Sequence, residues 1–362
     1  MKIIIYSIIG LIVFSFMFYH LAPVFGAKID NKGFEKIENF NKNSFVNKYT
    51  IDIKEDKKIE KKETGVLRQL LGEVKDREPT NPVKVNSRTT EEVIALNEGE
   101  LIWFGHSTFL VKQSNKTLLF DPMFSSRPSP VPFLVKKRYN EKLVITPENL
   151  PEIDAVLISH DHYDHLDHNS ILKLKEKTKR FIVPVGLDQH LMHWGVDKEK
   201  ITVLKWWEET KIDEVKINLV PSQHFSGRRL TRNETLWGGF VINSNNKNIY
   251  FSGDTGYGSH FKEIKERFKK IDFALLEAGQ YNINWSDIHM LPNQTVKAAE
   301  DLGVERFMPV HWGMFTLSTH KWTDPVERVK NYAKGKPFKV ETPEIGQVFN
   351  VFEDETKEWW KP

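Results

Sequence analysis

Four histidines and three aspartates lie within nine residues of this chain, in the segment His160-Asp161-His162-Tyr163-Asp164-His165-Leu166-Asp167-His168. Imidazole and carboxylate groups are good ligands for zinc, iron and manganese, whereas packing so many of them together without a metal would crowd like charges. A solvated polar loop is the alternative, but loops seldom need this density of histidine. The segment therefore predicts a metal site.

The spacing within this segment suits two ions. His160 and His162 are two residues apart, so on an extended chain both side chains point the same way and can hold one ion. Asp164 and His165 follow the turn and can serve a second ion, about 3.5 to 4 Å from the first, as in sites that clamp the attacking and leaving oxygens of a hydrolysis. Because a catalytic zinc usually has three protein ligands, the remaining ligands must come from elsewhere in the chain.

Three further candidate ligands each follow a short apolar run that is typical of a strand. They are His224 after residues 217–220, Asp254 after residues 249–251 and His311 after residues 306–310. Each one alone has an ordinary explanation, as a hydrogen-bonded core histidine or a turn carboxylate. Because all of them stand just beyond a strand-like run and before turn residues, we expect them to converge at one rim of a sheet.

In this order, the motif at 160–165 followed by His224, Asp254 and His311 resembles the metallo-β-lactamase fold superfamily. Residues 101–110, 119–125, 127–130 and 311–315 resemble one branch of it, the N-acyl-phosphatidylethanolamine phospholipase D-like hydrolases and their bacterial relatives. The resemblance runs from about Glu98 to the C-terminus. It implies an α/β fold with four layers, the αββα sandwich, which the alternation of short strand-like runs and amphipathic helical segments permits.

The resemblance also implies a role for each ligand. The first metal would be held by His160, His162 and His224, the second by Asp164, His165 and His311, and Asp254 would bridge the two. Zinc β-lactamases commonly have a cysteine near this point and this chain has none, so the carboxylate favours the phosphodiesterase and thioesterase branches over antibiotic hydrolysis. A hydroxide shared by the two ions would be the nucleophile, because coordination lowers the pKa of water to about 7. Zinc is expected, and the same ligands accept iron or manganese.

The predicted catalytic residues are Asp164, Asp254 and His289. His289 matches a histidine close to the site in the branch, where it would contact substrate or act as an acid. Its alternative role is to cap the helix that begins near Pro292.

Other polar residues near the motif are expected to support the site and not to bind metal. His106 and Asp121 match supporting positions of the branch. Asp161 and Asp167 are predicted to orient ligating imidazoles through the free ring nitrogen, and His168 is predicted to be solvated. The pair Arg228 and Arg229 is predicted to be a solvated surface pair, with phosphate binding as the alternative.

The chain divides by composition into three regions. Residues 1–25 contain an apolar run of about 17 residues that predicts a single-pass membrane anchor, uncleaved because residues 25–27 lack a suitable cleavage site, and the lysines on both flanks leave its orientation open. Residues 26–95 are rich in Lys, Asn, Glu and Asp and predict a polar linker or an arm laid on the catalytic domain, with one short helix at 65–72. Residues 96–362 form the predicted catalytic domain.

The net charge of +3 gives no electrostatic case for nucleic acid, and the absence of cysteine removes disulfides and thiol chemistry. We therefore expect a membrane-anchored enzyme with two divalent metal ions that hydrolyses a lipid or small-molecule phosphodiester, most simply a phospholipid. A nuclease or a lactone or thioester hydrolase on the same site, and a non-catalytic metal-binding envelope protein, are the alternatives.

Overall fold

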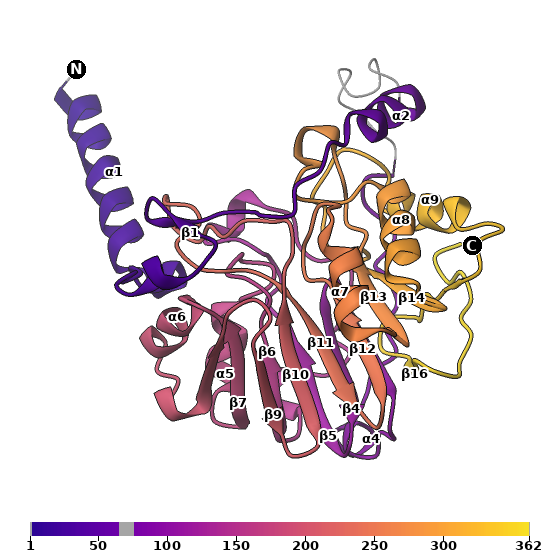
Figure 1. Ribbon diagram of the computed structural model, residues 1–362. Coiled ribbons are helices and arrows are strands. Elements are labelled where there is room, and N and C mark those ends of the chain that lie inside the picture. Colours follow the sequence, from indigo (N-terminus) through magenta and orange to yellow (C-terminus); the bar gives the residue numbers. More distant parts are fainter. Residues whose placement is uncertain (1, 65–75, 362) are drawn as a thin grey trace.

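Two sheets packed face to face make up the body of the protein (Figure 1). The computed structural model describes residues 2–64 and 76–361, so the helix predicted at 65–72 lies outside the described residues. Sheet A has the strand order β16-β3-β4-β5-β6-β7-β8, and sheet B has the order β15-β14-β13-β12-β11-β10-β9.

Short strands build both sheets. Those of sheet A are β3 (Glu100–Gly105), β4 (Thr108–Gln113), β5 (Lys116–Phe120), β6 (Ile153–Leu157), β7 (Thr178–Pro184), β8 (Ile201–Leu204) and β16 (Val348–Asn350). Those of sheet B are β9 (Glu209–Ile212), β10 (Val215–Val220), β11 (Gly239–Ser244), β12 (Lys247–Phe251), β13 (Phe273–Glu277), β14 (Arg306–Val310) and β15 (Lys339–Val340). Phe109 and Phe120 of sheet A stack with ring centroids 4.3 Å apart, and Phe251 of sheet B meets Phe109 edge-on at 5.1 Å. These aromatic contacts join the sheets through the core.

Helices cover the outer faces of the sheets. On sheet A lie α5 (His168–Leu174) and α6 (Leu187–His193), and on sheet B lie α7 (His260–Phe268), α8 (Pro292–Leu302) and α9 (Asp324–Tyr332). Phe261 and Ile264 of α7 and Ala298 of α8 are buried in one cluster with Tyr250 and Ala274 of sheet B, as the helical spacing of the apolar residues predicts. The predicted αββα sandwich is confirmed. The shorter elements are α4 (Thr90–Ile94) and the 3-10 turns η1 (Pro23–Phe25), η2 (Phe34–Lys36), η3 (Pro132–Leu134), η4 (Pro147–Asn149), η5 (Lys198–Lys200) and η6 (Ile283–Trp285).

The direction of the strands decides where polar residues can gather. In sheet A, β4 is antiparallel to both β3 and β5, and β6 is parallel to β5, so β3, β5 and β6 run the same way. In sheet B, β11 is antiparallel to both β10 and β12, and β13 and β14 continue parallel to β12. Within each sheet, the residues that follow these strands therefore leave at a common edge.

The N-terminal region lies outside this sandwich. Helix α1 (Lys2–Leu21) stands away from the body, and its window Ile4–Leu21 is long and apolar enough to cross a membrane, with none of it buried (Figure 1). The arm, residues 28–64, then crosses the body as the hairpin of β1 (Phe40–Asn41) and β2 (Ser44–Phe45) and the helix α2 (Lys54–Thr64).

Helix α2 forms from a run of charged residues. Lys and Glu are good helix formers, and the helix fixes the spacing of the side chains that reach the body. Lys57 Nζ lies 3.1 Å from the carboxylate of Asp287, and Asp56 accepts hydrogen bonds from the side-chain amides of Asn293 and Gln294. The described part of the arm thus lies on the body through specific polar contacts.

Candidate metal centre and active site

The predicted ligands lie on loops that leave the strand ends described above. Four loops carry them: loop 158–167 follows β6, loop 221–238 follows β10, loop 252–259 follows β12 and loop 311–323 follows β14. Sheet A supplies His160, His162, Asp164 and His165, and sheet B supplies His224, Asp254 and His311. All seven side chains meet at one rim of the sandwich.

Three imidazoles form a first group. His162 Nδ1 lies 2.9 Å from His160 Nε2 and 3.2 Å from His224 Nε2. The other nitrogen of His160 lies 2.9 Å from the hydroxyl of Ser159, and that of His224 lies 2.9 Å from the carbonyl oxygen of Ile288. A partner on one ring nitrogen fixes the orientation of the ring and leaves the other nitrogen for an ion.

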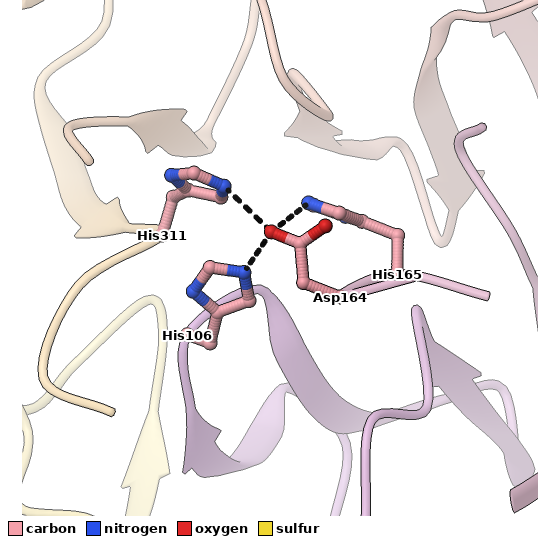
Figure 2. Close-up of side chains that lie close together, drawn as sticks. All are labelled: His106, Asp164, His165 and His311. Atoms are coloured by element: carbon pink, nitrogen blue, oxygen red, sulfur yellow. Dashed lines mark hydrogen bonds and ion pairs between the residues drawn. The ribbon is translucent and has the colours of Figure 1, made fainter. Parts of the chain in front are cut away.

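Asp164 is the centre of a second group (Figure 2). Its Oδ2 atom lies 3.0 Å from His106 Nε2, 3.5 Å from His311 Nε2 and 3.7 Å from His165 Nε2. Figure 2 shows the three rings around this one oxygen. His106, which follows β3, therefore contacts the predicted ligand Asp164 directly, as a residue that supports the site would.

Asp254 lies between the two groups and is buried. Its Oδ2 atom is 3.0 Å from His311 Nε2 and 3.2 Å from His165 Nε2. The same oxygen is 3.9 Å from the Nε2 atoms of both His160 and His224. This carboxylate is thus placed where the resemblance assigns a bridging ligand.

The two groups differ in charge in the protein without metal. Burial lowers the pKa of His160, His162 and His224, so these rings are neutral, which is the form that binds a metal ion. In the second group burial would also lower the pKa of His165 and His311, but Asp254 and Asp164 outweigh it and raise both, that of His311 to about 10.

Within the described residues, several buried polar atoms of the site have no hydrogen-bond partner of suitable geometry, although carboxylate oxygens lie near some of them. They are Nε2 of His165, Oδ1 of Asp254 and both ring nitrogens of His311. A buried polar atom left without a partner costs about 1–3 kcal/mol, and coordination of a cation would remove that cost. Imidazoles and carboxylates gathered in this way, with the donor atoms of each cluster within 4.8 Å of one another, fit divalent metal ions, and binding at the second group would displace the protons of His165 and His311.

Asp121 supports the second group through a contact with His165. It follows β5, is completely buried, and lies with Oδ2 2.7 Å from His165 Nδ1. The same carboxylate accepts hydrogen bonds from the backbone N–H and the hydroxyl of Ser159, whose hydroxyl also contacts His160. Asp121 therefore orients one ring in each group, directly for His165 and through Ser159 for His160.

A second buried carboxylate, Glu277, escaped the sequence interpretation. It ends β13, is completely buried, and accepts hydrogen bonds from the backbone N–H groups of Gly279 and Met290. Its Oε1 atom lies 3.4 Å from His289 Nδ1 and 3.7 Å from His311 Nδ1. The signal was present, since Glu277 is a polar residue at the end of an apolar strand, as are the predicted ligands.

His289 lies beside the metal-binding groups. Its ring centroid is 5.0 Å from that of His224 and 5.3 Å from that of His311. It does not cap α8, because Leu291 occupies the N-cap position. The backbone N–H of Leu291 donates a hydrogen bond to the side-chain oxygen of Gln294 there. The alternative capping role is thus excluded by the structure.

Asp161 and Asp167 accept hydrogen bonds from neighbouring loops and do not contact the ligating imidazoles that they were expected to orient. Asp161 accepts hydrogen bonds from the backbone N–H of Gly227 and the hydroxyl of Thr235. Asp167 caps α5 through the backbone N–H of Ser170 and also binds Ser125. Both side chains point away from the ligand cluster because the motif turns between them, so their place in the sequence beside ligands is misleading.

Arg228 also differs from its prediction as a solvated surface residue, since it is only 3 % exposed. Its guanidinium lies over the ring of Tyr163 and donates hydrogen bonds to the carbonyl oxygens of Asp161 and Leu166 in the metal motif. Its Nε atom donates to the carbonyl oxygen of Val24, just after α1. Arg228 thus ties the end of the N-terminal helix to the metal motif.

The arm supplies a residue that no motif predicted. The side chain of Asn47 donates to the carbonyl oxygen of His224 at 2.8 Å and accepts from the backbone N–H of the same residue at 3.1 Å. Nearby, the arm pairs with the body as an isolated bridge between Thr50 and Gly258. Asn47 therefore holds the backbone of a predicted ligand from both sides.

Two of the histidines have strained backbones that brace each other. His106 has φ 55° and His311 has φ 69°, in the left-handed region that costs a residue other than glycine about 1–3 kcal/mol. The N–H of His311 donates to the carbonyl oxygen of His106, and the N–H of His106 donates to that of Trp312. This pairing across the two sheets holds both side chains toward Asp164.

A cavity of about 580 Å³ opens over the metal-binding groups. Its floor includes His162, Asp164, Asp254, His289 and His311. Its walls are formed by Phe225, Arg232, Gln280, Asn284, Trp285, Asp287, Ile288 and Leu317. Apolar and polar walls over a cluster of charged groups suit an amphipathic substrate.

Comparison with known proteins agrees with this geometry. The family described as the Beta-lactamase superfamily domain matches residues 116–312, more than half of the chain. An uncharacterized protein of Mycobacterium tuberculosis is 41% identical over 249 residues, which cover 68% of this chain and 67% of that protein. N-acyl-phosphatidylethanolamine-hydrolyzing phospholipase D 1 of Caenorhabditis elegans is 29% identical over 242 residues, covering 63% of this chain and 68% of the relative.

Among solved structures, Igni18, a metallo hydrolase from the archaeon Ignicoccus hospitalis, superposes with a TM-score of 0.53 at 23% identity. The match covers 69% of this chain and 97% of that one, and it concerns the fold. The relatives bear out the suspected phospholipase D-like branch as well as the superfamily. By its matched domain, its sandwich of two sheets and its rim of imidazoles and carboxylates, the chain belongs to the beta-lactamase superfamily and is a metal-dependent hydrolase of the metallo-β-lactamase fold.

Proposed function

We propose that this chain is a membrane-anchored phosphodiesterase that uses two divalent metal ions, most simply zinc, and acts on a phospholipid of the N-acyl-phosphatidylethanolamine type. The observation that carries the proposal is the pair of ligand groups joined by Asp254, whose Oδ2 lies within 3.9 Å of an imidazole nitrogen in each. The phospholipase D relative and the apolar helix α1 support a lipid substrate.

The proposal assigns one metal ion to each of the two groups. The first ion would be held by His160, His162 and His224, the second by Asp164, His165 and His311, with Asp254 common to both. Such ions, when bound, lower the pKa of water to about 7 and stabilise the charge that develops on phosphoryl oxygens. Asp121 keeps the ring of His165 in place, and Asn47 keeps the backbone of His224 in place.

We assign His289 to the leaving group. The contact of its Nδ1 with the carboxylate of Glu277 leaves Nε2 as the nitrogen that donates a proton to the departing alkoxide. Arg232 lies at the cavity wall over the ring of Phe225 and offers a positive charge for an anionic headgroup. Trp285 and Leu317 form apolar walls for the acyl chain.

The test is hydrolysis by the purified full-length protein supplied with zinc. A bis-aryl phosphodiester should be cleaved, and N-acyl-phosphatidylethanolamine should yield phosphatidic acid and an N-acylethanolamine. His165→Ala and Asp254→Ala should each abolish both reactions, because each change removes a ligand. The matched controls His193→Ala and Asp197→Ala alter exposed residues away from the site and should leave both rates unchanged.

Activity that persists in both ligand variants would overturn the proposal. A substrate panel distinguishes the alternatives on the same site: preferential cleavage of RNA would indicate a nuclease, and preferential cleavage of a lactone or thioester would indicate those hydrolases. Metal binding without turnover of any substrate in the panel would indicate a non-catalytic protein.

A further inference from the structure

Three apolar side chains project from the body of the protein without cover. Outside α1, the most exposed large hydrophobic residues in the described part of the chain are Leu230, Phe133 and Leu134, at 85%, 80% and 73% exposure. Apolar residues scattered singly on a surface are ordinary, but adjacent ones held in the open mark a contact surface. Their position relative to α1 indicates what that surface contacts.

Leu230 lies beside the end of the apolar helix. Its backbone N–H donates to the hydroxyl of Tyr19 at 3.2 Å, and the guanidinium of its neighbour Arg229 lies over the Tyr19 ring. Arg228 donates to the carbonyl oxygen of Val24 at 2.8 Å. Because a helix that crosses a bilayer ends at the membrane surface, residues that contact its C-terminal end lie at that surface.

Phe133 and Leu134 reach the same place from another loop. Val24, Pro130 and Pro132 line one cavity of about 280 Å³, so the loop before Phe133 borders the chain just after α1. Arg127 lines this cavity and also the adjoining one, whose walls include Phe133 and Leu134. The three exposed apolar residues therefore belong to one surface that is continuous with the end of α1.

Hydrogen bonds and prolines hold the loop that carries Phe133 and Leu134 with both side chains exposed. Arg127 donates hydrogen bonds to the carbonyl oxygens of Pro132 and Val135, on either side of the exposed pair. Prolines at 128, 130 and 132 limit the backbone further. Lys136 and Lys137, which follow Val135, are exposed as well. Apolar side chains followed by lysines are the composition of segments that lie in a membrane interface, where the lysines meet anionic headgroups.

We propose that the Phe133–Leu134 turn and Leu230 insert into the same lipid bilayer that holds α1, and so give the body of the protein two membrane contacts besides the anchor. The proposal rests on the membrane anchor of the proposed function but not on its chemistry. The loop that carries Leu230 also supplies Phe225 and Arg232 to the walls of the active-site cavity. Insertion would thus fix the cavity beside the bilayer surface, where a lipid substrate is found.

The absence of cysteine makes a direct test possible, because a single introduced cysteine is the only thiol to label. The full-length variants Leu134→Cys and Leu230→Cys are labelled with a fluorophore sensitive to polarity and reconstituted in vesicles of phosphatidylcholine and phosphatidylglycerol. Ile94→Cys is the control, since Ile94 is 59% exposed on α4, at the end of the molecule away from α1 (Figure 1).

Insertion predicts that the emission of labels at 134 and 230 shifts to the blue and is quenched by brominated acyl chains, while the label at 94 is unaffected. Equal behaviour of the labels at 134 and 94 would overturn the proposal. A blue shift without quenching by the lipid would also overturn it, because a second copy of the chain or another protein would then cover the surface.

A second pair of measurements separates insertion from catalysis. The double variant Phe133→Ser and Leu134→Ser should keep the same thermal unfolding midpoint and the same rate on the soluble bis-aryl phosphodiester, and should lose rate several-fold on lipid in vesicles. An unchanged rate on vesicles would count against insertion. If the wild-type protein cleaves no phosphodiester, the proposed function fails, while the quenching result still decides insertion.

Discussion

The rim loops of the sandwich and the N-terminal arm both reach the active site, but they bring different groups to it. The rim loops present imidazoles and carboxylates, and the clusters of described residues that could hold a metal ion consist of rim residues and strand ends. The arm has no histidine, since none occurs between residues 26 and 95, and it contacts the site through the amide of Asn47 and the ion pair of Lys57. The candidate reactive groups thus come from strand ends. The groups that hold them in place come also from the arm, which contributes no candidate ligand.

Among the residues that only support the site, the largest effect should come from the carboxylate of Asp121 on the rim. Asp121→Asn keeps the size of the side chain but removes its negative charge and replaces one of the two acceptor oxygens shared by His165 and Ser159 with an NH2 donor, so we expect a 10–100-fold loss of metal affinity and of phosphodiesterase rate. Zinc titration and hydrolysis of the bis-aryl substrate measure both. Asp154→Asn is the matched control, because Asp154 lies on β6 and binds Thr117 and Lys179 away from the site. Unchanged zinc affinity in Asp121→Asn would show that the ring of His165 is held by other contacts.

The arm should matter less than the rim carboxylate, but measurably. Asn47→Ala removes both hydrogen bonds to the backbone of His224, and we expect about a tenfold loss of metal affinity, the lower end of the range for such supporting residues. Asn47→Asp retains the acceptor for the His224 N–H and should recover part of the loss. Asn41→Ala, an exposed position on the same arm, is the control. If Asn47→Ala binds zinc like the wild type, the arm only covers the site and does not hold it.

The same contrast explains what could be predicted from the sequence. The ligand types were recognisable because a local pattern, an apolar run followed by a polar residue and a turn, marks the end of a strand, and strands that run the same way end together. Asn47 carries no such pattern, since its partner is 177 residues away and is a backbone group. The charge run of α2 leaves open whether the segment is a solvated linker or an arm on the body, because composition does not reveal that Asp56 and Lys57 meet complementary groups there.

Prediction from neighbours in the sequence failed where the chain turns. Asp161 and Asp167 stand beside ligands in the motif, but one faces Gly227 and the other caps α5. The burial of Arg228 likewise depends on the path of two distant segments, at Val24 and Leu166, that no local pattern fixes. The domain boundaries at residues 25 and 95 and the metal-binding roles stay predictions.

The junction of arm and body should show itself in the pH dependence of stability. His260 is completely buried beneath the arm, near Tyr49, and burial lowers its pKa to about 3. Because the folded-state pKa is below the unfolded value of about 6.5, this residue's contribution to stability is full above pH 6.5 and is lost as the pH falls toward 3. Between pH 7.5 and pH 5.5 the loss should be about 1.4 kcal/mol.

Urea unfolding at the two pH values measures this loss in the wild type and in His260→Gln. The variant starts from a lower stability, but its loss between the two pH values should be smaller by about the contribution of one histidine. An equal loss in both proteins would mean that His260 is protonated in the folded state and that the arm does not seal it from solvent.

The smallest effect should come from the ion pair between the arm and the loop of His289. Lys57 and Asp287 are both partly exposed, so water and salt screen the pair, and Lys57→Ala should cost less than about 1 kcal/mol of stability and leave the hydrolysis rate unchanged. Lys58→Ala, which breaks a pair with Glu55 within α2, is the matched control. A salt-sensitive loss of rate in Lys57→Ala as large as that in Asn47→Ala would reverse the comparison. The arm would then act on the site through its charges, and the hydrogen bonds of Asn47 would form only because the charges dock the arm. If the rate is unchanged, the arm acts on the active site through uncharged hydrogen bonds such as those of Asn47, and the charges of α2 only secure the helix on the body.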